Sequence, residues 1–146
     1  MADLKRHSTA TWQGDTSSGG GEMSGDSGEF GGVKYSFPSR FEHEAGSNPE
    51  EFLGAAHAAC FNMVVAKELS EQGNPPENLE TRATVTLRED GGDFEVTAVH
   101  LALTGTVPGV DDAAFRQIAE EASENCPVSR LLKPGLETLT VEVDLQ

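Results

Sequence analysis

A long apolar segment in the middle of the chain constrains the fold more than any other feature. Residues 52–66 are apolar apart from two polar interruptions. Asn48 is a residue type that caps the N-termini of helices, and Pro49 fits the first helical position. Gly73 is typical of a residue just beyond a helix end. Because the segment is apolar on almost every side, we expect a helix that is buried at the centre of the fold.

The segment after this helix alternates apolar and polar residues, which is the pattern of strands with one buried face. The alternation covers residues 81–88 and 94–106. Gly91 and Gly92 lie between the two runs, and a glycine pair between alternating runs favours a β-hairpin. We therefore expect two antiparallel strands after the central helix.

Shorter elements are expected on both sides of this core. Tight glycine turns, apolar spacing and alternation predict strands at residues 7–12, 21–24, 33–37 and 139–145, a helix at residues 111–125 and a helical turn at residues 128–132. With 146 residues the chain is long enough for one domain and short for two. The expected fold is α+β, as a single domain over residues 1–146.

The charge of the chain excludes several classes of partner. Twenty-five acidic residues against ten basic ones give a formal net charge of −15, which repels nucleic acid and anionic membranes. Only four residues are lysine. This composition fits a salt-adapted proteome, and simple solubility explains it equally well. A free energy of unfolding that did not rise between low and molar salt would exclude the first explanation.

No targeting or membrane segment is expected. The first twenty residues contain no apolar run of the kind that secretory signals need. The apolar part of the central helix is shorter than the roughly 20 residues of a membrane span. We therefore expect a soluble, cytoplasmic protein.

The chain has two cysteines, Cys60 in the central helix and Cys126 at the end of a later helix, directly before Pro127. In a reducing cytoplasm a structural disulfide is unexpected, so the pair indicates either redox catalysis or inert burial. Two cysteines are too few for a typical zinc site unless histidines join them, and no histidine pair has ligand spacing. No metal site is expected.

Three polar residues could serve the Cys60 thiol. A neighbouring cation would favour the thiolate, and Arg40, expected on the loop before the central helix, could supply that charge. Glu50 could hold the guanidinium in place, although a glutamate in the first helical turn also suits the helix dipole. His57 lies three residues before Cys60 on the same helical face. It could exchange a proton, or be a hydrogen-bonded core residue.

The motifs of this chain, in their order and spacing, resemble those of the OsmC/Ohr family, the osmotically inducible protein C and organic hydroperoxide resistance proteins. The resemblance covers nearly the whole chain, and Ala56-His57 together with the position of Arg40 resembles the OsmC branch. The motifs that carry it are Trp12-Gln13-Gly14-Asp15, Arg40-Phe41-Glu42, Ser47-Asn48-Pro49-Glu50-Glu51, Gly54-Ala55-Ala56-His57-Ala58-Ala59-Cys60-Phe61 and Cys126-Pro127-Val128-Ser129.

The resemblance implies antiparallel sheets packed around the central helix in an intertwined homodimer. It implies a thiol-dependent peroxidase, active in oxidative or osmotic stress, that reduces organic hydroperoxides to alcohols. Cys60 would match the peroxidatic cysteine, which becomes a sulfenic acid, and Cys126 the resolving cysteine that forms a disulfide with it. Arg40 and Glu50 would match the charged pair that activates the thiolate, with His57 as a possible accessory residue.

The resemblance further implies that no cofactor is bound. A dithiol reductant, expected to be a lipoyl group and possibly carried on a lipoylated protein, would reduce the disulfide. Apolar residues near the peroxidatic cysteine, namely Phe52, Phe61 and Met63, would favour peroxides with an organic tail.

The spacing of Glu50 and Cys60 predicts how the subunits cooperate. The two residues are ten positions apart, which is about 15 Å along one helix. A carboxylate cannot span that distance to a thiol on its own helix. If Glu50 serves the Cys60 site, we expect it to come from the partner subunit.

Two other functions stay open at this stage. A general thiol–disulfide oxidoreductase is less favoured, because the cysteines lack the Cys-x-x-Cys spacing. A stress protein that binds a hydrophobic ligand, with the cysteines as packing residues, is the alternative that is not an enzyme. Rapid oxidation of Cys60 at neutral pH would distinguish the peroxidase from the binding protein.

Overall fold

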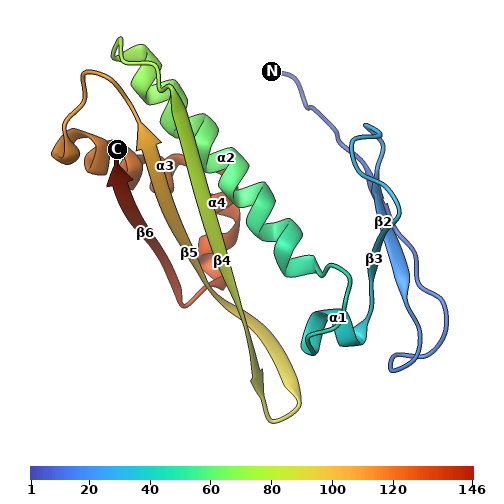
Figure 1. Cartoon of the computed structure of the whole chain (residues 1–146). Helices are drawn as coiled ribbons and strands as arrows, with labels where there is room; N and C mark the ends of the chain where they lie inside the picture. The colour runs from blue at the N-terminus through green and yellow to red at the C-terminus, as the bar shows by residue number, and fades with distance from the viewer. The chain divides into compact units, whose positions relative to one another are not determined.

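A computed structural model describes all 146 residues, and the chain divides into two compact units, residues 1–49 and 50–146. Each unit is described by itself. The α+β class expected from the sequence is confirmed, with helices and two three-stranded sheets (Figure 1). The expectation of a single domain over residues 1–146 stays a prediction.

The first unit is built on a small antiparallel sheet. Strands β1 (Ser8–Ala10), β2 (Gly21–Gly25) and β3 (Val33–Tyr35) are ordered β1-β2-β3. The three strands expected here are confirmed, with β1 and β3 shorter than expected and β2 one residue longer.

A short helix that the sequence analysis did not predict, α1 (Phe37–Phe41), follows β3. Ser36 and Ser39 cap it reciprocally: the Ser36 hydroxyl accepts from the backbone N–H of Ser39, and the Ser39 hydroxyl accepts from that of Ser36. The expectation that Arg40 lies on a loop is therefore wrong, since Arg40 is in the last turn of α1.

The central helix α2 (Pro49–Glu71) has 23 residues and begins at the predicted proline. Its C-terminal end is set by Gly73, which has a φ of 82° and donates its N–H to the carbonyl oxygen of Ser70. In the single chain only one face of α2 is buried. The buried residues follow helical spacing and are Gly54, His57, Phe61, Val65 and Leu69.

The opposite face of α2 is apolar but exposed. It carries Ala55, Ala56, Ala59 and Met63, and the Met63 side chain is 74% exposed. We expected this helix to be buried on all sides. In the single chain it is buried on one face only.

The second unit contains a longer sheet with the order β4-β5-β6. Strands β4 (Asn78–Asp90) and β5 (Asp93–Thr106) form the predicted antiparallel hairpin. The turn is Gly91-Gly92, with φ values of 61° and 92°. Two successive positive φ angles suit a two-residue hairpin turn and favour glycine at both positions.

The last strand, β6 (Thr138–Leu145), pairs parallel to β5, so the expectation of purely antiparallel sheets needs one correction. A parallel pair requires a long crossover connection. That connection is made of α3 (Asp112–Asn125), α4 (Pro127–Leu132) and a 3₁₀ turn η1 (Lys133–Gly135).

One face of this sheet carries the core. Alternate residues of β5 are buried and point toward the helices, while the residues between them are less buried. Helices α2, α3 and α4 lie on that one side of the sheet (Figure 1). The core residues are Phe61, Val65, Leu69, Val99, Leu101, Leu103, Val107, Phe115, Ile118, Ala119, Ala122 and Cys126.

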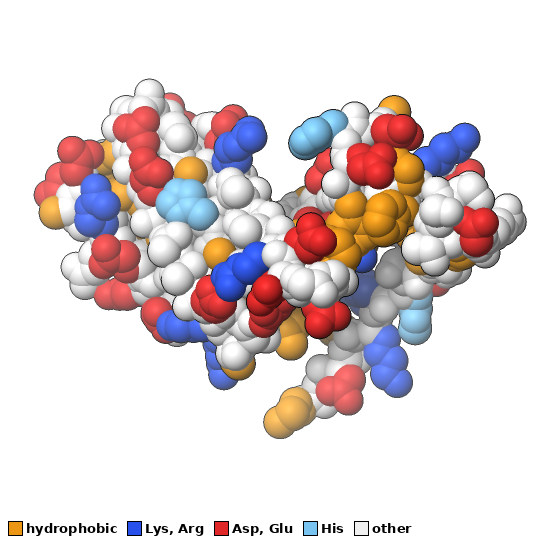
Figure 2. Space-filling model, turned by 90° about the horizontal axis from the view of Figure 1, so that it is seen from below, with side chains coloured by type: hydrophobic (Ala, Val, Ile, Leu, Met, Phe, Trp, Pro, Cys, Tyr) orange, Lys and Arg blue, Asp and Glu red, His pale blue; other side chains and the backbone are white.

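Acidic side chains are spread over the surface presented in Figure 2, and fewer Lys and Arg side chains lie among them. This distribution agrees with the net charge of −15. None of the helices combines the length and apolar character that a membrane span requires.

Core packing predicts the effect of adding one methyl group at Gly105. A Cβ atom there would lie 2.5 Å from a ring carbon of the buried Phe115. Overpacking a core typically costs about 1–3 kcal/mol, so we expect Gly105→Ala to lower the free energy of unfolding by that amount. Urea unfolding measures it. Gly135→Ala is the matched control, because a Cβ atom there would contact no other atom. Equal stability of the two variants would contradict the close packing of Phe115 against Gly105.

Candidate active site

The two cysteines, far apart in the sequence, meet in the second unit. Cys60 is half-buried on α2, and Cys126 is fully buried at the junction of α3 and α4. Both are free thiols, and their side chains are hydrogen-bonded to each other. Two thiols in direct contact can form a disulfide without a large movement of the backbone.

Local backbone chemistry places Cys126 at this junction. Its N–H donates to the Ala122 carbonyl oxygen at 2.8 Å and closes α3. Its ψ of 123° then turns the chain out of the helix, as expected for a residue before proline. Pro127 begins α4 at a position where no N–H is needed. The Cys-Pro pair thereby ends one helix and starts the next.

The first turn of α4 also contacts the Cys60 sulfur. The N–H groups in the first turn of a helix have no partner within the helix, and Cys126 makes no side-chain cap. The Val128 N–H instead donates to the sulfur of Cys60. This contact favours the thiolate, because an N–H donor stabilises negative charge on its acceptor.

The pKa of Cys60 is nevertheless raised above its usual value of 9.0. Burial is the main cause, the hydrogen bond to Cys126 and the charge of Cys126 add to it, and the Val128 N–H opposes it. Since the thiolate is the nucleophile, Cys60 is mostly an unreactive thiol at neutral pH in this arrangement. A positive charge or a further hydrogen-bond donor near the sulfur would lower this pKa and favour the thiolate.

His57 lies one helical turn before Cys60 and is fully buried. Its Nε2 is 2.6 Å from the Oγ of Ser129, which is also fully buried, and its Nδ1 has no hydrogen-bond partner. Burial lowers the pKa of His57 below 6.5, so the imidazole is neutral at pH 7.

The two charged candidates are placed on separate elements. Arg40 is exposed on α1, with its guanidinium carbon 5.1 Å from the centroid of the Phe41 ring. Glu50 is in the first turn of α2. Because α2 is continuous from Pro49 to Glu71, about 15 Å of helix separates Glu50 from Cys60. The activating roles of Arg40 and Glu50 stay predictions.

Sequence reasoning missed the two residues of α4 that contact the cysteine helix. Val128 and Ser129 were part of a quoted motif but were assigned no role. Pro127 gave a usable signal, because a helix that begins there leaves the next N–H groups without partners inside the helix.

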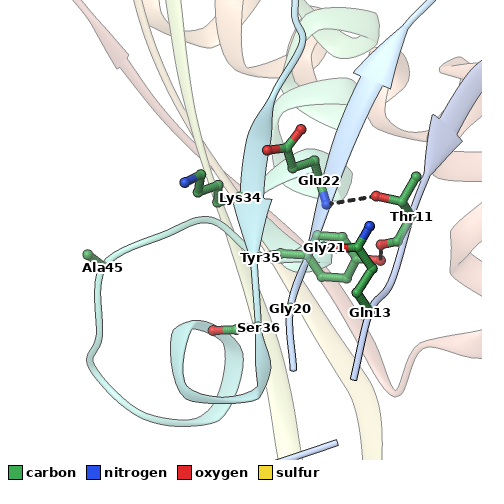
Figure 3. A pocket seen from close by; sticks show the side chains of 9 residues that line it. All are labelled: Thr11, Gln13, Gly20, Gly21, Glu22, Lys34, Tyr35, Ser36 and Ala45. Atoms are coloured by element: carbon green, nitrogen blue, oxygen red, sulfur yellow. Dashed lines mark hydrogen bonds between the residues drawn. The ribbon is translucent and has the colours of Figure 1, made fainter. Parts of the chain in front are cut away.

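One hollow in the first unit does not contain the cysteines. It has a volume of about 480 Å³ and is lined by Thr11, Gln13, Gly20, Gly21, Glu22, Lys34, Tyr35, Ser36 and Ala45. Figure 3 shows these residues, with the Glu22 N–H donating to the Thr11 hydroxyl. Polar and apolar groups contribute about equally to this lining, which contains no sulfur. No group of three or more His, Cys, Asp or Glu residues is placed to hold a metal ion.

A family model and individual known proteins match this chain. A model of the OsmC-like protein family matches residues 42–141. Peroxiredoxin OsmC of Escherichia coli is 41% identical over 130 residues, which cover 89% of this chain and 91% of that protein. An organic hydroperoxide resistance protein-like protein of Mycoplasma pneumoniae is 33% identical over 97 residues, covering 63% of this chain and 64% of that protein.

Solved structures share the fold over nearly the whole chain. An OsmC-like protein from Mycoplasma pneumoniae has a TM-score of 0.76 at 18% identity, covering 99% of each chain. The organic hydroperoxide resistance protein OhrB of Bacillus subtilis has a TM-score of 0.69 at 23% identity, covering 98% of each chain. At these identities the likeness shows the fold.

The buried, neutral state of His57 predicts a pH-dependent part of the stability. The unfolded chain takes up a proton near pH 6.5, whereas the folded chain resists it. Stability from this residue is complete above pH 6.5 and is lost as the pH falls through the lowered pKa, by at most about 1.4 kcal/mol per pH unit. Urea unfolding from pH 7.5 to 5 of wild type and His57→Gln should therefore show a difference that shrinks on acidification.

The control for that comparison is His43→Gln, which removes an exposed histidine. If the wild-type and His57→Gln curves ran parallel over this pH range, His57 would not be held neutral in the fold.

Proposed function

The chain belongs to the OsmC-like protein family, and we propose that it is a cysteine-based peroxidase that reduces organic hydroperoxides to alcohols in oxidative or osmotic stress. The observation that supports this function most directly is the hydrogen bond between the Cys60 and Cys126 side chains. Relatives of this chain named peroxiredoxin and organic hydroperoxide resistance protein support the same chemistry.

The proposed cycle uses both thiols. The Cys60 thiolate attacks one oxygen of the O–O bond, and the other oxygen takes a proton and leaves as the alcohol. Cys60 is then a sulfenic acid. The Cys126 sulfur attacks the Cys60 sulfur, water leaves, and a Cys60–Cys126 disulfide remains. The peroxide has been reduced by the two electrons that the thiol pair has lost.

A dithiol completes the cycle by thiol–disulfide exchange, which restores both thiols and leaves the reductant as its own disulfide. We propose a lipoyl group for this role, carried on a lipoylated protein. In this scheme the protein holds no prosthetic group, because its own sulfur atoms carry the electrons.

Activation of Cys60 is assigned to Arg40 and Glu50. The pKa of Cys60 is raised, and a guanidinium held by a carboxylate near the sulfur would lower it. About 15 Å of helix separates Glu50 from Cys60 in one chain. The carboxylate is therefore assigned to Glu50 of a second copy of the chain.

Two features of the surface support a homodimer. The exposed face of α2 is apolar, and such a face on a long central helix is typical of an interface. The outer edges of β4 and β6 have no strand partner in their sheet, and strand edges of this length are sites of pairing with another chain. An intertwined dimer would cover both.

The substrate preference needs one revision. Phe61 is fully buried in the core, so it cannot line an open peroxide site as the sequence suggested. Met63 is exposed two residues farther along α2, and Phe52 is half-buried one turn before Ala56. Of the three residues, we therefore propose that only Phe52 and Met63 favour a peroxide with an organic tail.

The ligand-binding alternative receives less support. Polar and apolar groups line the hollow of the first unit in about equal measure, whereas a hydrophobic ligand needs a mostly apolar pocket. We also propose a cytoplasmic location, where reduced thiols are maintained.

The function is tested by mixing the reduced protein with cumene hydroperoxide, tert-butyl hydroperoxide or hydrogen peroxide, and following free thiols and peroxide consumption with a dithiol. Both thiols should be lost rapidly, faster with the organic peroxides. Cys60→Ser should abolish the reaction, and Cys126→Ser should stop at a Cys60 sulfenic acid. Slow oxidation without preference among the peroxides would make the cysteines ordinary core residues.

The shared site is tested by mixing inactive subunits. Neither Cys60→Ser nor Glu50→Gln homodimers should have appreciable activity. A heterodimer of the two variants contains one site with an intact Cys60 and an intact Glu50 from the other chain, so mixing should restore activity to that site. If Glu50 served its own chain, mixing would restore nothing.

A further inference from the structure

The first turn of α4 is joined to α2 at two points that lie one helical turn apart. At one point the Val128 N–H donates to the Cys60 sulfur. At the other, the Ser129 hydroxyl is 2.6 Å from His57 Nε2. Since Cys126 immediately precedes this turn, both contacts determine where the second thiol lies relative to the first.

The two contacts differ in how they respond to oxidation. The Val128 contact uses the Cys60 sulfur itself, whose charge and bonding change at every step of the proposed cycle. The contact between His57 and Ser129 contains no sulfur atom. Oxidation of Cys60 therefore changes no atom of this contact.

The second contact is also an unusual feature for a protein core. Ser129 and His57 are both 0% exposed, and His57 Nδ1 is buried without a partner. Buried polar groups are costly even when paired, and an unpaired one more so. Two apolar residues of similar size would satisfy packing here, so stability alone does not account for the pair.

We propose that His57 and Ser129 are positioning residues, which hold Cys126 against Cys60 so that the disulfide forms before a second peroxide can react. This inference rests on the proposed peroxidase function. Two reactions compete for the sulfenic acid. Attack by Cys126 releases water and gives the disulfide, whereas a second hydroperoxide transfers an oxygen atom, leaves as its alcohol and gives a sulfinic acid.

The ratio of disulfide to sulfinic acid therefore measures the position of Cys126. It does not depend on how fast Cys60 is first oxidised. Single-turnover reactions, quenched and analysed by mass spectrometry over a series of tert-butyl hydroperoxide concentrations, give this ratio for wild type and each variant.

Ser129→Ala and His57→Leu should each slow closure of the disulfide by about tenfold, as misplacement of reacting groups does. Sulfinic acid should then appear at a correspondingly lower peroxide concentration. His57→Gln keeps a side-chain amide that can bond to Ser129, so its ratio should lie nearer that of wild type. Ser123→Ala, which changes a buried serine bonded within α3, should leave the ratio unchanged.

The double variant His57→Leu with Ser129→Ala separates positioning from stability. It leaves neither partner unpaired, so its urea midpoint should recover relative to the single variants. Its closure should stay slow. If either single variant does not fold, the double variant is measured in its place.

Closure within about twofold of wild type in the variants that lack the contact would overturn the inference, since coupled groups produce larger effects. The proposed function fails in a different way. If Cys126→Ser protein gave no Cys60 sulfenic acid with the peroxide, there would be no peroxidase reaction in which to position a thiol.

Discussion

The contact between the first turn of α4 and helix α2 is the interaction on which the rest of the site depends. It brings Cys126 to Cys60, gives the Val128 N–H an acceptor, and pairs the buried side chains of Ser129 and His57. The contact follows from a simple constraint, because a proline after Cys126 ends one helix and begins another without a missing hydrogen bond. Backbone geometry thus places the two cysteines side by side without help from charged residues.

The same contact leaves the thiol incompletely activated. Burial and Cys126 raise the pKa of Cys60 more than the single N–H of Val128 lowers it. The exposed face of α2, which includes Met63, is apolar. A second subunit could cover this face and supply a carboxylate, which is why the proposed activity and the proposed dimer are one hypothesis.

Elements with strong local signals could be predicted from the sequence. Pro49 and Gly73 set the ends of α2, and Gly91-Gly92 set the hairpin, because proline and glycine act through the backbone of their own residues. The parallel pairing of β6 could not, since alternation gives the buried face of a strand but not its direction. Ser129 was missed for a related reason, because its partner His57 is far away in the sequence and only tertiary packing joins them.

The most direct test of the account is the mass of the reduced protein after one equivalent of tert-butyl hydroperoxide in a single turnover. The account predicts a loss of two hydrogen atoms and a peptide pair joined through Cys60 and Cys126, formed in the absence of any reductant. A gain of oxygen on Cys60 with Cys126 still free would contradict the resolving role of Cys126. An unchanged mass would contradict the central claim, that Cys60 is a nucleophile toward peroxides.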